Sequence, residues 1–352
     1  MKEAKTFFIT GTQRSGTTLL SVAMGQHPAI QIDGYSRAFR MISVLNNYEK
    51  ILSENLAYAE KEVLNWKLTT DYKRRLADFL DLENFARYGS YRELIHTSIE
   101  QFLQREQKEI WGDKSPNLHY YIRDIIALFP TTKIVHIVRD GRATAQSHAV
   151  RSHTHVLLAA QEWVRGNSTA LVNQQLLGKG QYLIIKYEDL LRQPETTLRQ
   201  VCDFLELSFS KEMLSLSQKG QADNYVKDHF DTAKIDAFKN DIPAKTLRKI
   251  EQIQAPLLNK LGYSLQFADA LQKAKPLSLS RWMWLRLCDA IRALFRSKRV
   301  GMVNRQNVEV RISWRNRLSK FALHLAHDYL PKRVYERIHE RAFNRERRYS
   351  KD

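Results

Sequence analysis

Residues 7–20 decide the fold of this chain, and they read Phe7-Phe8-Ile9-Thr10-Gly11-Thr12-Gln13-Arg14-Ser15-Gly16-Thr17-Thr18-Leu19-Leu20. Residues 5–9 predict a short buried strand, because aromatic and β-branched residues stand together and turn residues follow at once. Gly11 and Gly16 let the loop bend tightly and let its backbone N–H groups approach a ligand. A helix is predicted from about Gly16 to His27. This arrangement is the standard geometry for holding a phosphate, since the N–H groups of a helix's first turn have no partner within the helix.

The two glycines have the spacing of a P-loop, G-x-x-x-x-G, but Thr17 stands where a nucleoside triphosphatase has Lys. That Lys reaches the β- and γ-phosphates, whereas here the cation lies inside the loop as Arg14. The loop can therefore hold a phosphate and one adjacent anionic group, and it lacks the usual grip on a triphosphate. A glycine turn alone is a weak signal, but the guanidinium and hydroxyls that follow favour a functional loop over a purely structural turn.

A second stretch of the same kind covers residues 133–151. Residues 133–138 predict another buried strand, Arg139-Asp140-Gly141-Arg142 turns out of it, and residues 143–151 predict a helix that carries Ser147. We expect Arg142 to pair with Asp140 or to face solvent.

The residues Gly11–Thr18 resemble the 5′-phosphosulfate loop of the sulfotransferases that use 3′-phosphoadenosine 5′-phosphosulfate. In that family an Arg at a strand end and a Ser eight residues later clasp the 3′-phosphate, and the matching residues are Arg139 and Ser147. Arg151 lies on the same helical face one turn after Ser147 and can join them. Two phosphate sites on neighbouring strand ends are what a bisphosphorylated nucleotide requires. The resemblance thus implies a nucleotide site made of Gly11, Thr12, Gln13, Arg14, Ser15, Gly16, Thr17, Thr18, Arg139, Ser147 and Arg151.

The resemblance covers about residues 5–265, with further matches at Trp163, residues 186–190 and residues 261–263. Residues 138–151 are most similar to the tyrosylprotein and bacterial types of the family. The match places Tyr187 beside the adenine; the alternative, that Tyr187 packs under the sheet, stays open.

Strands that alternate with helices predict an α/β fold, a parallel sheet with helices on both faces. We expect a P-loop-like sulfotransferase domain over residues 1–265, with a helical insert at 36–107 on the acceptor side, and a basic amphipathic helical extension over 266–352. In such sheets ligands bind beyond the carboxyl ends of the strands. The candidate residues all fall at such ends: Gly11 to Thr18, Asp33, Lys114, Arg139 and Tyr187.

Composition narrows the class of protein. The chain has 352 residues, 43% hydrophobic content and a net charge of +18. Residues 276–352 hold 19 Lys and Arg against 7 Asp and Glu, so most of the positive charge lies there. Two cysteines, Cys202 and Cys288, give neither a disulfide framework nor a metal quartet, which fits a reducing compartment. We see no signal peptide and no apolar run long enough to span a membrane, and we expect a cytoplasmic protein.

Sulfuryl transfer to a hydroxyl resembles phosphoryl transfer, in which the bridging oxygen of the donor gains negative charge. Arg14 and Lys114 are the candidate cations beside that oxygen. No metal is required, and no His or Cys spacing suggests one. A base must take the proton of the acceptor.

At the positions where the family has its catalytic base, this chain has other residues. Cytosolic members have a His where this chain has Pro116, and tyrosylprotein-type members have a Glu where it has Tyr35. Asp33 is the nearest carboxylate, and we take it as the base; capping the turn that follows it is an equal alternative. Asp113 and His148 are further candidates.

Residues 280–298 have the pattern of a helix that lies in a membrane interface. Three interpretations stay open: packing on the catalytic domain, contact with an anionic membrane surface, and, least favoured, nucleic-acid binding. A second, weaker apolar stripe follows at 318–329, and a basic helix is predicted at 333–348. The apolar stripe of this predicted helix consists of Trp284, Leu287, Cys288, Ile291, Leu294 and Phe295. Its positive charges are those of Arg281, Arg286, Arg292, Arg296, Lys298 and Arg299.

The sequence thus predicts an enzyme that moves a sulfuryl group from 3′-phosphoadenosine 5′-phosphosulfate to a hydroxyl of a carbohydrate, lipid or peptide, at the cytoplasmic face of a membrane if the tail binds one. Two alternatives remain. One is a P-loop nucleotide kinase or triphosphatase, against which the Thr at position 17 argues. The other is a catalytically inactive membrane-surface protein on the same scaffold, which the missing bases favour.

Overall fold

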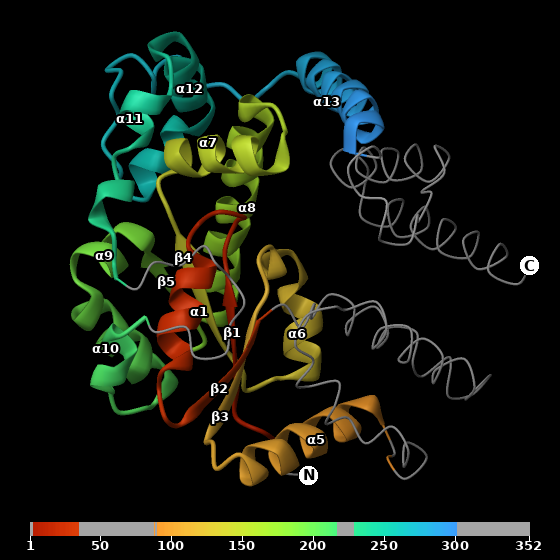
Figure 1. The fold of residues 1–352 in the computed structure, drawn as a ribbon, viewed down its shortest axis with the longest axis vertical. Helices are drawn as coiled ribbons and strands as arrows, with labels where there is room; N and C mark the ends of the chain where they lie inside the picture. Colours follow the sequence, from red (N-terminus) through yellow and green to blue (C-terminus); the bar gives the residue numbers. More distant parts are fainter. Residues whose placement is uncertain (1–2, 35–87, 89, 217–228, 301–352) are drawn as a thin grey trace, which may run out of the picture. The chain divides into compact units, whose positions relative to one another are not determined.

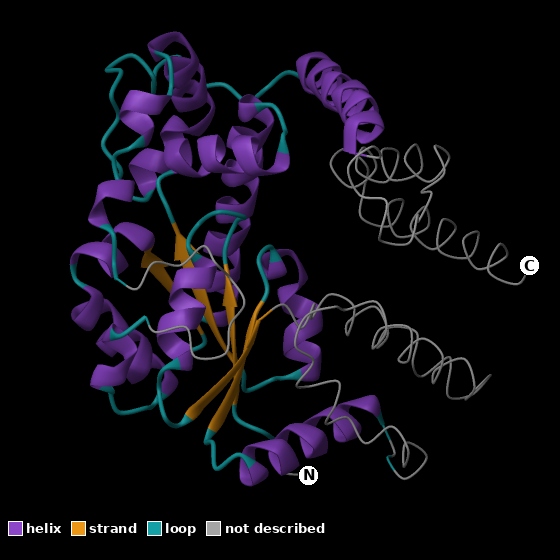
Figure 2. Cartoon of the chain, in the orientation of Figure 1, coloured by secondary structure: helices purple, strands orange, loops and turns teal. Residues whose placement is uncertain are grey.

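A parallel sheet of five strands carries the candidate residues (Figures 1 and 2). The computed structural model describes residues 3–34, 88, 90–216 and 229–300. The chain forms two units, Met1–Ser278 and Leu279–Asp352, and the sheet belongs to the first. Its strands are β1 (Thr6–Thr10), β2 (Ile30–Gly34), β3 (Ile110–Lys114), β4 (Lys133–Val138) and β5 (Tyr182–Lys186), in the order β2-β3-β1-β4-β5.

Helices cover both faces of the sheet, and β1 shows why. Its residues are all buried, and alternate side chains point to opposite faces of a strand. Phe7 and Ile9 pack with α1 (Thr17–Gly25), α9 (Tyr187–Arg192) and α10 (Pro194–Leu205). Phe8 packs with α5 (Tyr91–Arg105), α6 (Ile122–Leu128) and the second half of α8 (Val156–Leu177). Figure 1 shows α1, α9 and α10 on one side of the sheet and α6 on the other. The predicted fold class is confirmed.

The order of the strands reverses at β1. The chain leaves β1 for β2 and β3 on one side and then crosses to β4 and β5 on the other. Ile9 is in register with Lys114 of β3, and Thr10 with His136 of β4. In open α/β sheets ligands bind at such a switch point, beyond the carboxyl ends of the strands. The loop after β1 therefore lies between Lys114 and the residues that follow Val138.

The sequence predicts helices at 143–151, 157–177, 194–205 and 245–261. The structure has them as α7 (Gly141–Ser152), α8, α10 and α12 (Ala244–Lys260). It adds α11 (Phe238–Asp241) and the short helices η2 (Leu118–Tyr121), η3 (Lys211–Leu214) and η4 (Thr232–Lys234). Residues 182–190 predict a strand that runs into a polar turn. This prediction was wrong, because α9 begins at Tyr187 directly after β5. Glu188 and Asp189 in the first turn of α9 complement its dipole, and Leu190 and Leu191 are buried.

In the second unit, α13 covers Leu279–Val300 and confirms the helix predicted at 280–298. None of the helices in the described ranges combines the length and the apolar character that crossing a bilayer demands. Most of the predicted insert, residues 36–87, and the predicted elements at 318–348 lie outside the described residues. The division into a catalytic domain of residues 1–265 and an extension of 266–352 stays a prediction.

Candidate functional site

The loop between β1 and α1 is held by its own residues in a left-handed turn. Arg14 has a φ of 71° and Gly16 a φ of 100°. The Thr12 and Ser15 hydroxyls lie 2.6 Å apart, and the Ser15 N–H donates to the Thr12 carbonyl at 3.2 Å. Gly16 is the N-cap of α1 and has no side chain that could accept from the first-turn amides. The loop therefore presents backbone N–H groups and the positive end of the helix to an anion.

Both glycines of the loop are needed because the backbone passes close to other elements. A Cβ on Gly11 would lie 2.5 Å from the carbonyl oxygen of Ile137 in β4. A Cβ on Gly16 would lie 2.3 Å from a ring carbon of Tyr187. The same Tyr187 ring lies 4.7 Å from the guanidinium carbon of Arg139. Tyr187 therefore packs under the loop and under Arg139, within the core, where burial raises its pKa.

Lys114 approaches the loop from β3. Its side chain is almost fully buried, and its Nζ lies 3.4 Å from the Thr18 hydroxyl in the first turn of α1. The neighbouring Ser115 hydroxyl donates to the Asp113 carboxylate at 2.6 Å. A buried ammonium beside a phosphate-type loop strengthens attraction for an anion, because the surroundings screen charge less than water does.

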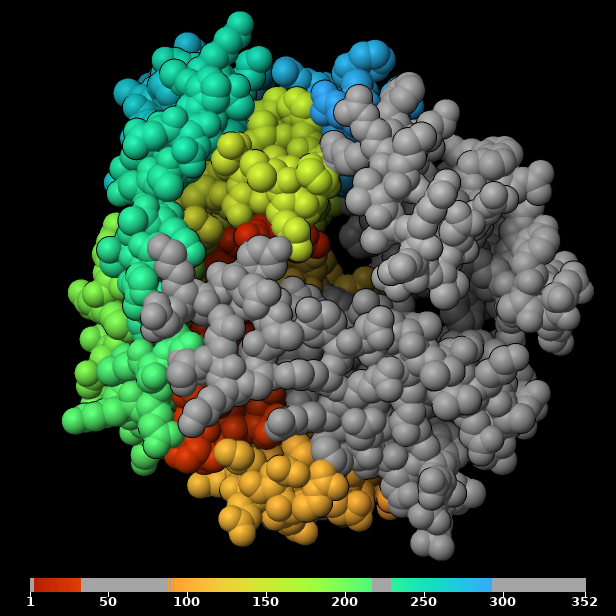
Figure 3. All heavy atoms as spheres, viewed as in Figure 1, coloured from red at the N-terminus to blue at the C-terminus, as the bar shows by residue number. Residues whose placement is uncertain are grey.

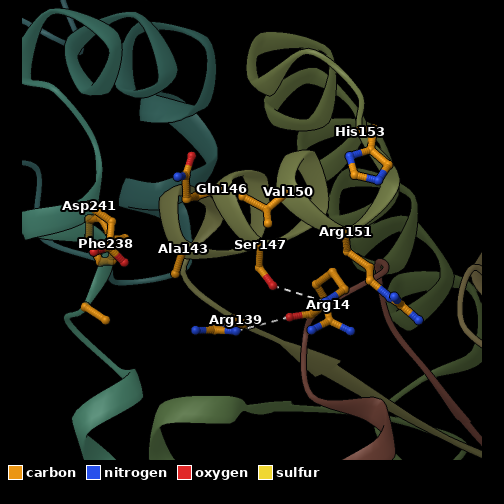
Figure 4. Close-up of a pocket in the computed structure, with 11 residues that line it drawn as sticks. Arg14, Arg139, Ala143, Gln146, Ser147, Val150, Arg151, His153, Phe238 and Asp241 are labelled. Atoms are coloured by element: carbon orange, nitrogen blue, oxygen red, sulfur yellow. Dashed lines mark hydrogen bonds between the residues drawn. The ribbon is translucent and has the colours of Figure 1, made fainter. Parts of the chain in front are cut away.

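Arg14, Arg139 and Ser147 meet beside a cavity of about 510 Å³ (Figure 4). The Arg14 Nε–H donates to the Ser147 hydroxyl of α7 at 3.0 Å, and Arg139 Nη1 donates to the Arg14 carbonyl at 3.4 Å. Figure 4 shows Arg151 beside Arg14, and Figure 3 shows the N-terminal part of the chain (red) at the surface next to α7 (yellow-green). The cavity is lined by Arg14, Arg139, Ala143, Gln146, Ser147, Val150, Arg151, His153, Ala237, Phe238 and Asp241.

The charges around this cavity favour an anionic ligand. Three of its lining residues are arginines and one, Asp241, is a carboxylate. Cavities of this volume are typical of small-molecule and cofactor sites. Guanidinium groups bind phosphates through charge-assisted, often paired hydrogen bonds. The structure thus brings the loop, Lys114, Arg139, Ser147, Arg151 and Tyr187 together at the switch point of the sheet.

A buried ion cluster fixes the start of α7 behind the cavity. Arg142 pairs with Asp140 at 2.6 Å and with Glu251 of α12, which confirms the expected pairing with Asp140 over exposure to solvent. Burial alone would lower the pKa of Arg142, but the hydrogen bonds and charges of both carboxylates raise it above its ordinary value. The Trp163 ring N–H donates to the Arg139 carbonyl at 2.9 Å. Trp163 therefore holds the backbone of Arg139, and the Arg14 carbonyl holds its guanidinium.

Sequence reasoning missed the roles of Glu188 and Tyr263. Glu188 accepts from the Asp140 N–H at 2.9 Å and from the Tyr263 hydroxyl at 2.9 Å, so it ties α9 and the end of α12 to the start of α7. Burial is the main cause that raises the pKa of Glu188. Both residues stood within the family match, at 186–190 and 261–263, but the match alone named no contact for them.

Asp33, the candidate base, lies at the end of the edge strand β2. Its backbone is in register with Asp113 of β3, so β3 separates it from β1. Adjacent strands lie about 4.8 Å apart, which puts the Asp33 backbone about 10 Å from β1. Its side chain and Tyr35 are outside the described residues. Among the residues described here, no group of three or more His, Cys, Asp or Glu could hold a metal ion.

A model of known protein families described as "Sulfotransferase family" matches residues 6–211. The protein-tyrosine sulfotransferase of Drosophila melanogaster is 25% identical over 301 residues, which are 78% of this chain and 54% of that protein. Protein-tyrosine sulfotransferase A of Caenorhabditis elegans is 23% identical over 284 residues, 73% of this chain and 66% of that protein. The chain therefore spans between about half and two thirds of the length of these relatives.

Two solved structures share the fold. The sulfotransferase domain of the Synechococcus PCC 7002 olefin synthase has 22% identity and a TM-score of 0.53, over 75% of this chain and 97% of that domain. The sulfotransferase domain from the curacin biosynthetic pathway has 21% identity and a TM-score of 0.54, over 75% of this chain and 100% of that domain. At these identities the likeness concerns the arrangement of the elements.

Proposed function

This chain belongs to the sulfotransferase family, and we propose that it transfers a sulfuryl group from 3′-phosphoadenosine 5′-phosphosulfate to a hydroxyl of an acceptor. The observation that carries the proposal is the arginine-lined cavity beside the β1–α1 loop. It combines two groups of anion-binding residues, from β1–α1 and from β4–α7, and the Arg14–Ser147 hydrogen bond joins them. A nucleotide with phosphates on both sides of its ribose needs two such groups within its own length.

The donor fits the residues present. The backbone of Gly11 to Thr18 would hold its 5′ end, with Gln13, Thr17 and the hydroxyls of the loop around it. Arg139, Ser147 and Arg151 would hold its 3′-phosphate. Tyr187 would support Arg139 and flank the base of the nucleotide from under the loop. No metal ion takes part in the proposed reaction.

Arg14 and Lys114 are the proposed electrostatic catalysts. When bound, the donor supplies the sulfuryl group, and the bond between sulfur and the bridging oxygen breaks as the acceptor oxygen bonds to sulfur. Fixed cations that face the site of developing charge lower the barrier without reorganising. The buried ammonium of Lys114 next to Thr18 is one such cation. Asp33 is the proposed acceptor of the hydroxyl proton.

For the acceptor we propose the hydroxyl of tyrosine in a peptide or protein. The support is the naming of both relatives above as protein-tyrosine sulfotransferases. A phenol loses its proton more readily than an alcohol does, so it makes a smaller demand on the base.

Donor binding is tested by titrating the full chain with adenosine 3′,5′-bisphosphate in a calorimeter. Arg14→Ala and Arg139→Ala should each weaken binding about ten- to hundredfold, because each removes a charged hydrogen bond to the ligand. Arg199→Ala, which breaks a solvent-exposed pair with Glu195, is the matched control and should bind like the unmutated chain. ATP with Mg²⁺ serves as the comparison ligand. Absence of bisphosphate binding, or tighter binding of ATP, would refute the proposal.

Turnover is tested with the sulfate donor, a tyrosine peptide and its phenylalanine counterpart. Sulfation of the tyrosine peptide alone is expected. Lys114→Ala should lower kcat about a hundredfold or more while leaving bisphosphate affinity within a factor of about ten, since Lys114 acts on charge that develops during transfer. Nucleotide binding without sulfation of any hydroxyl compound would instead identify an inactive scaffold.

A further inference from the structure

Helix α13 carries a broad apolar face that the structure leaves exposed. The exposed fractions are 49% for Leu279, 45% for Met283, 64% for Trp284, 44% for Leu287 and 43% for Ile291. At 3.6 residues per turn these five side chains occupy an arc of about 140° on one side of the helix. Exposed large apolar residues scattered singly need no explanation, but five on one continuous face mark a surface that meets something else.

This face is not the one that α13 buries within the protein. Trp282 and Leu285 are buried, at 1% and 8% exposure. On the helical wheel Trp282 lies about 130° and Leu285 about 170° from the centre of the exposed arc. The helix therefore has one apolar side already covered and a second, wider apolar side in contact with solvent.

Basic residues flank the exposed arc. Arg281 and Arg292 lie about 60° and 80° beyond one edge of it, at 3.6 residues per turn. Arg286 lies about 20° beyond the other edge, with its guanidinium 5.2 Å from the ring of the buried Trp282. Arg292 is largely exposed and pairs only loosely with Asp289, at 3.4 Å. Lysine and arginine outnumber acidic residues by 19 to 7 in residues 276–352. An apolar face flanked by positive charges fits a partner that has an apolar interior and negatively charged groups at its surface.

We propose that α13 docks on an anionic lipid surface, with Leu279, Met283, Trp284, Leu287 and Ile291 in the boundary between headgroups and acyl chains. Trp favours this boundary because its ring is apolar and its N–H is polar. The exposed Arg281 and Arg292 would contribute electrostatic attraction to anionic headgroups. A second copy of the same face is the poorer partner, since its arginines would meet arginines. The helix would lie in the plane of the surface.

The test is co-sedimentation of the full chain with phosphatidylcholine vesicles, with and without phosphatidylserine. Binding is expected only when phosphatidylserine is present, and it should weaken as salt increases. The double variant Trp284→Ser, Leu287→Ser should weaken binding about tenfold or more, because it removes two apolar side chains from the interface. The matched control is Val172→Ser, Leu176→Ser, which alters two exposed apolar residues one turn apart on α8. It should bind like the unmutated chain.

Quenching of tryptophan fluorescence by bromine-labelled lipids gives a second readout. Quenching is expected in the full chain, and Trp284→Phe should reduce it while vesicle binding persists. Three results would overturn the proposal: no vesicle binding, equal loss of binding in the α8 control, or a dimer that dissociates in the Trp284→Ser, Leu287→Ser variant without any effect on vesicles. The last would show that a second copy covers the face.

Discussion

Gly16 is the residue at which the loop depends most on having no side chain. Its φ of 100° disfavours any L-residue, and a Cβ there would lie 2.3 Å from the Tyr187 ring, which the core holds in place. Gly16→Ala should lower the free energy of unfolding by about 1–3 kcal/mol and weaken bisphosphate binding, because Tyr187 also supports Arg139. Chemical denaturation and calorimetry measure the two effects.

The control for this change is Gly180→Ala. Gly180 has open space around the position of a Cβ and no left-handed backbone, so alanine there should change stability by no more than about 0.5 kcal/mol. Equal effects of the two alanines would mean that the contact between Gly16 and Tyr187 does not hold the loop.

Among single residues, those that stand in a motif with a fixed spacing could be predicted from the sequence. Arg14, Arg139 and Ser147 stand in motifs whose geometry is local, and the structure places them around one cavity. The stacking of Tyr187 between Gly16 and Arg139 depends on how α9 meets α1, which no local pattern encodes. The same holds for Glu188, whose partners come from α7 and the chain after α12.

At the scale of elements, the ion cluster of Arg142, Asp140 and Glu251 joins α7 to α12. Arg142→Met should lower the free energy of unfolding by about 3–5 kcal/mol, because it leaves two buried carboxylates without their cation. Arg199→Met on α10 breaks a pair that is about half exposed and should cost less than about 1 kcal/mol. Urea unfolding of both variants measures the difference. If the two variants lost stability equally, the cluster would not be what anchors α7.

Strands and long helices were predictable because their hydrophobic periods are unambiguous, as in β4 and α10. The end of β5 was not: Tyr187-Glu188-Asp189-Leu190 suits a polar turn as well as a first helical turn. Burial of Leu190 and Leu191 against the sheet decides for the helix, and that burial is a tertiary contact.

At the scale of the whole molecule, two buried histidines make stability depend on pH. Burial lowers the pKa of His136 from 6.5 to about 4, and burial together with the charge of His136 lowers the pKa of His119 well below 6.5. The unfolded chain therefore binds these protons first as the pH falls. The free energy of unfolding should decrease below pH 6.5, by up to about 1.4 kcal/mol per pH unit for each histidine, until the folded state also takes up the proton.

Denaturation with urea between pH 7 and pH 4.5 checks this expectation. His136→Gln should reduce the slope of stability against pH whatever it does to stability at pH 7, where the hydrogen bonds with Asn167 and Tyr182 also count. Gly180→Ala, which changes no titratable group and has open space around the position of a Cβ, should leave the slope unchanged. A slope that His136→Gln does not alter would assign the acid sensitivity to other groups.

The sequence predicts that the sheet is parallel but does not predict the order of its strands. Alternating elements predict a parallel sheet, but which strands neighbour β1 follows from the crossovers. Those crossovers also decide which candidate residues meet, since they put Arg139 next to the loop and leave Asp33 beyond β3.

The central place of β1 has a consequence for biosynthesis. β1 leaves the ribosome before the other strands of the described sheet, and its partners Trp111 and Lys133 are translated much later. Until then its apolar residues and its backbone groups have no sheet to join, and a nascent chain in that condition is prone to aggregate. Among the strands of this sheet, β1 is thus the one translated longest before its neighbours, and chaperones that bind nascent chains should find a target there.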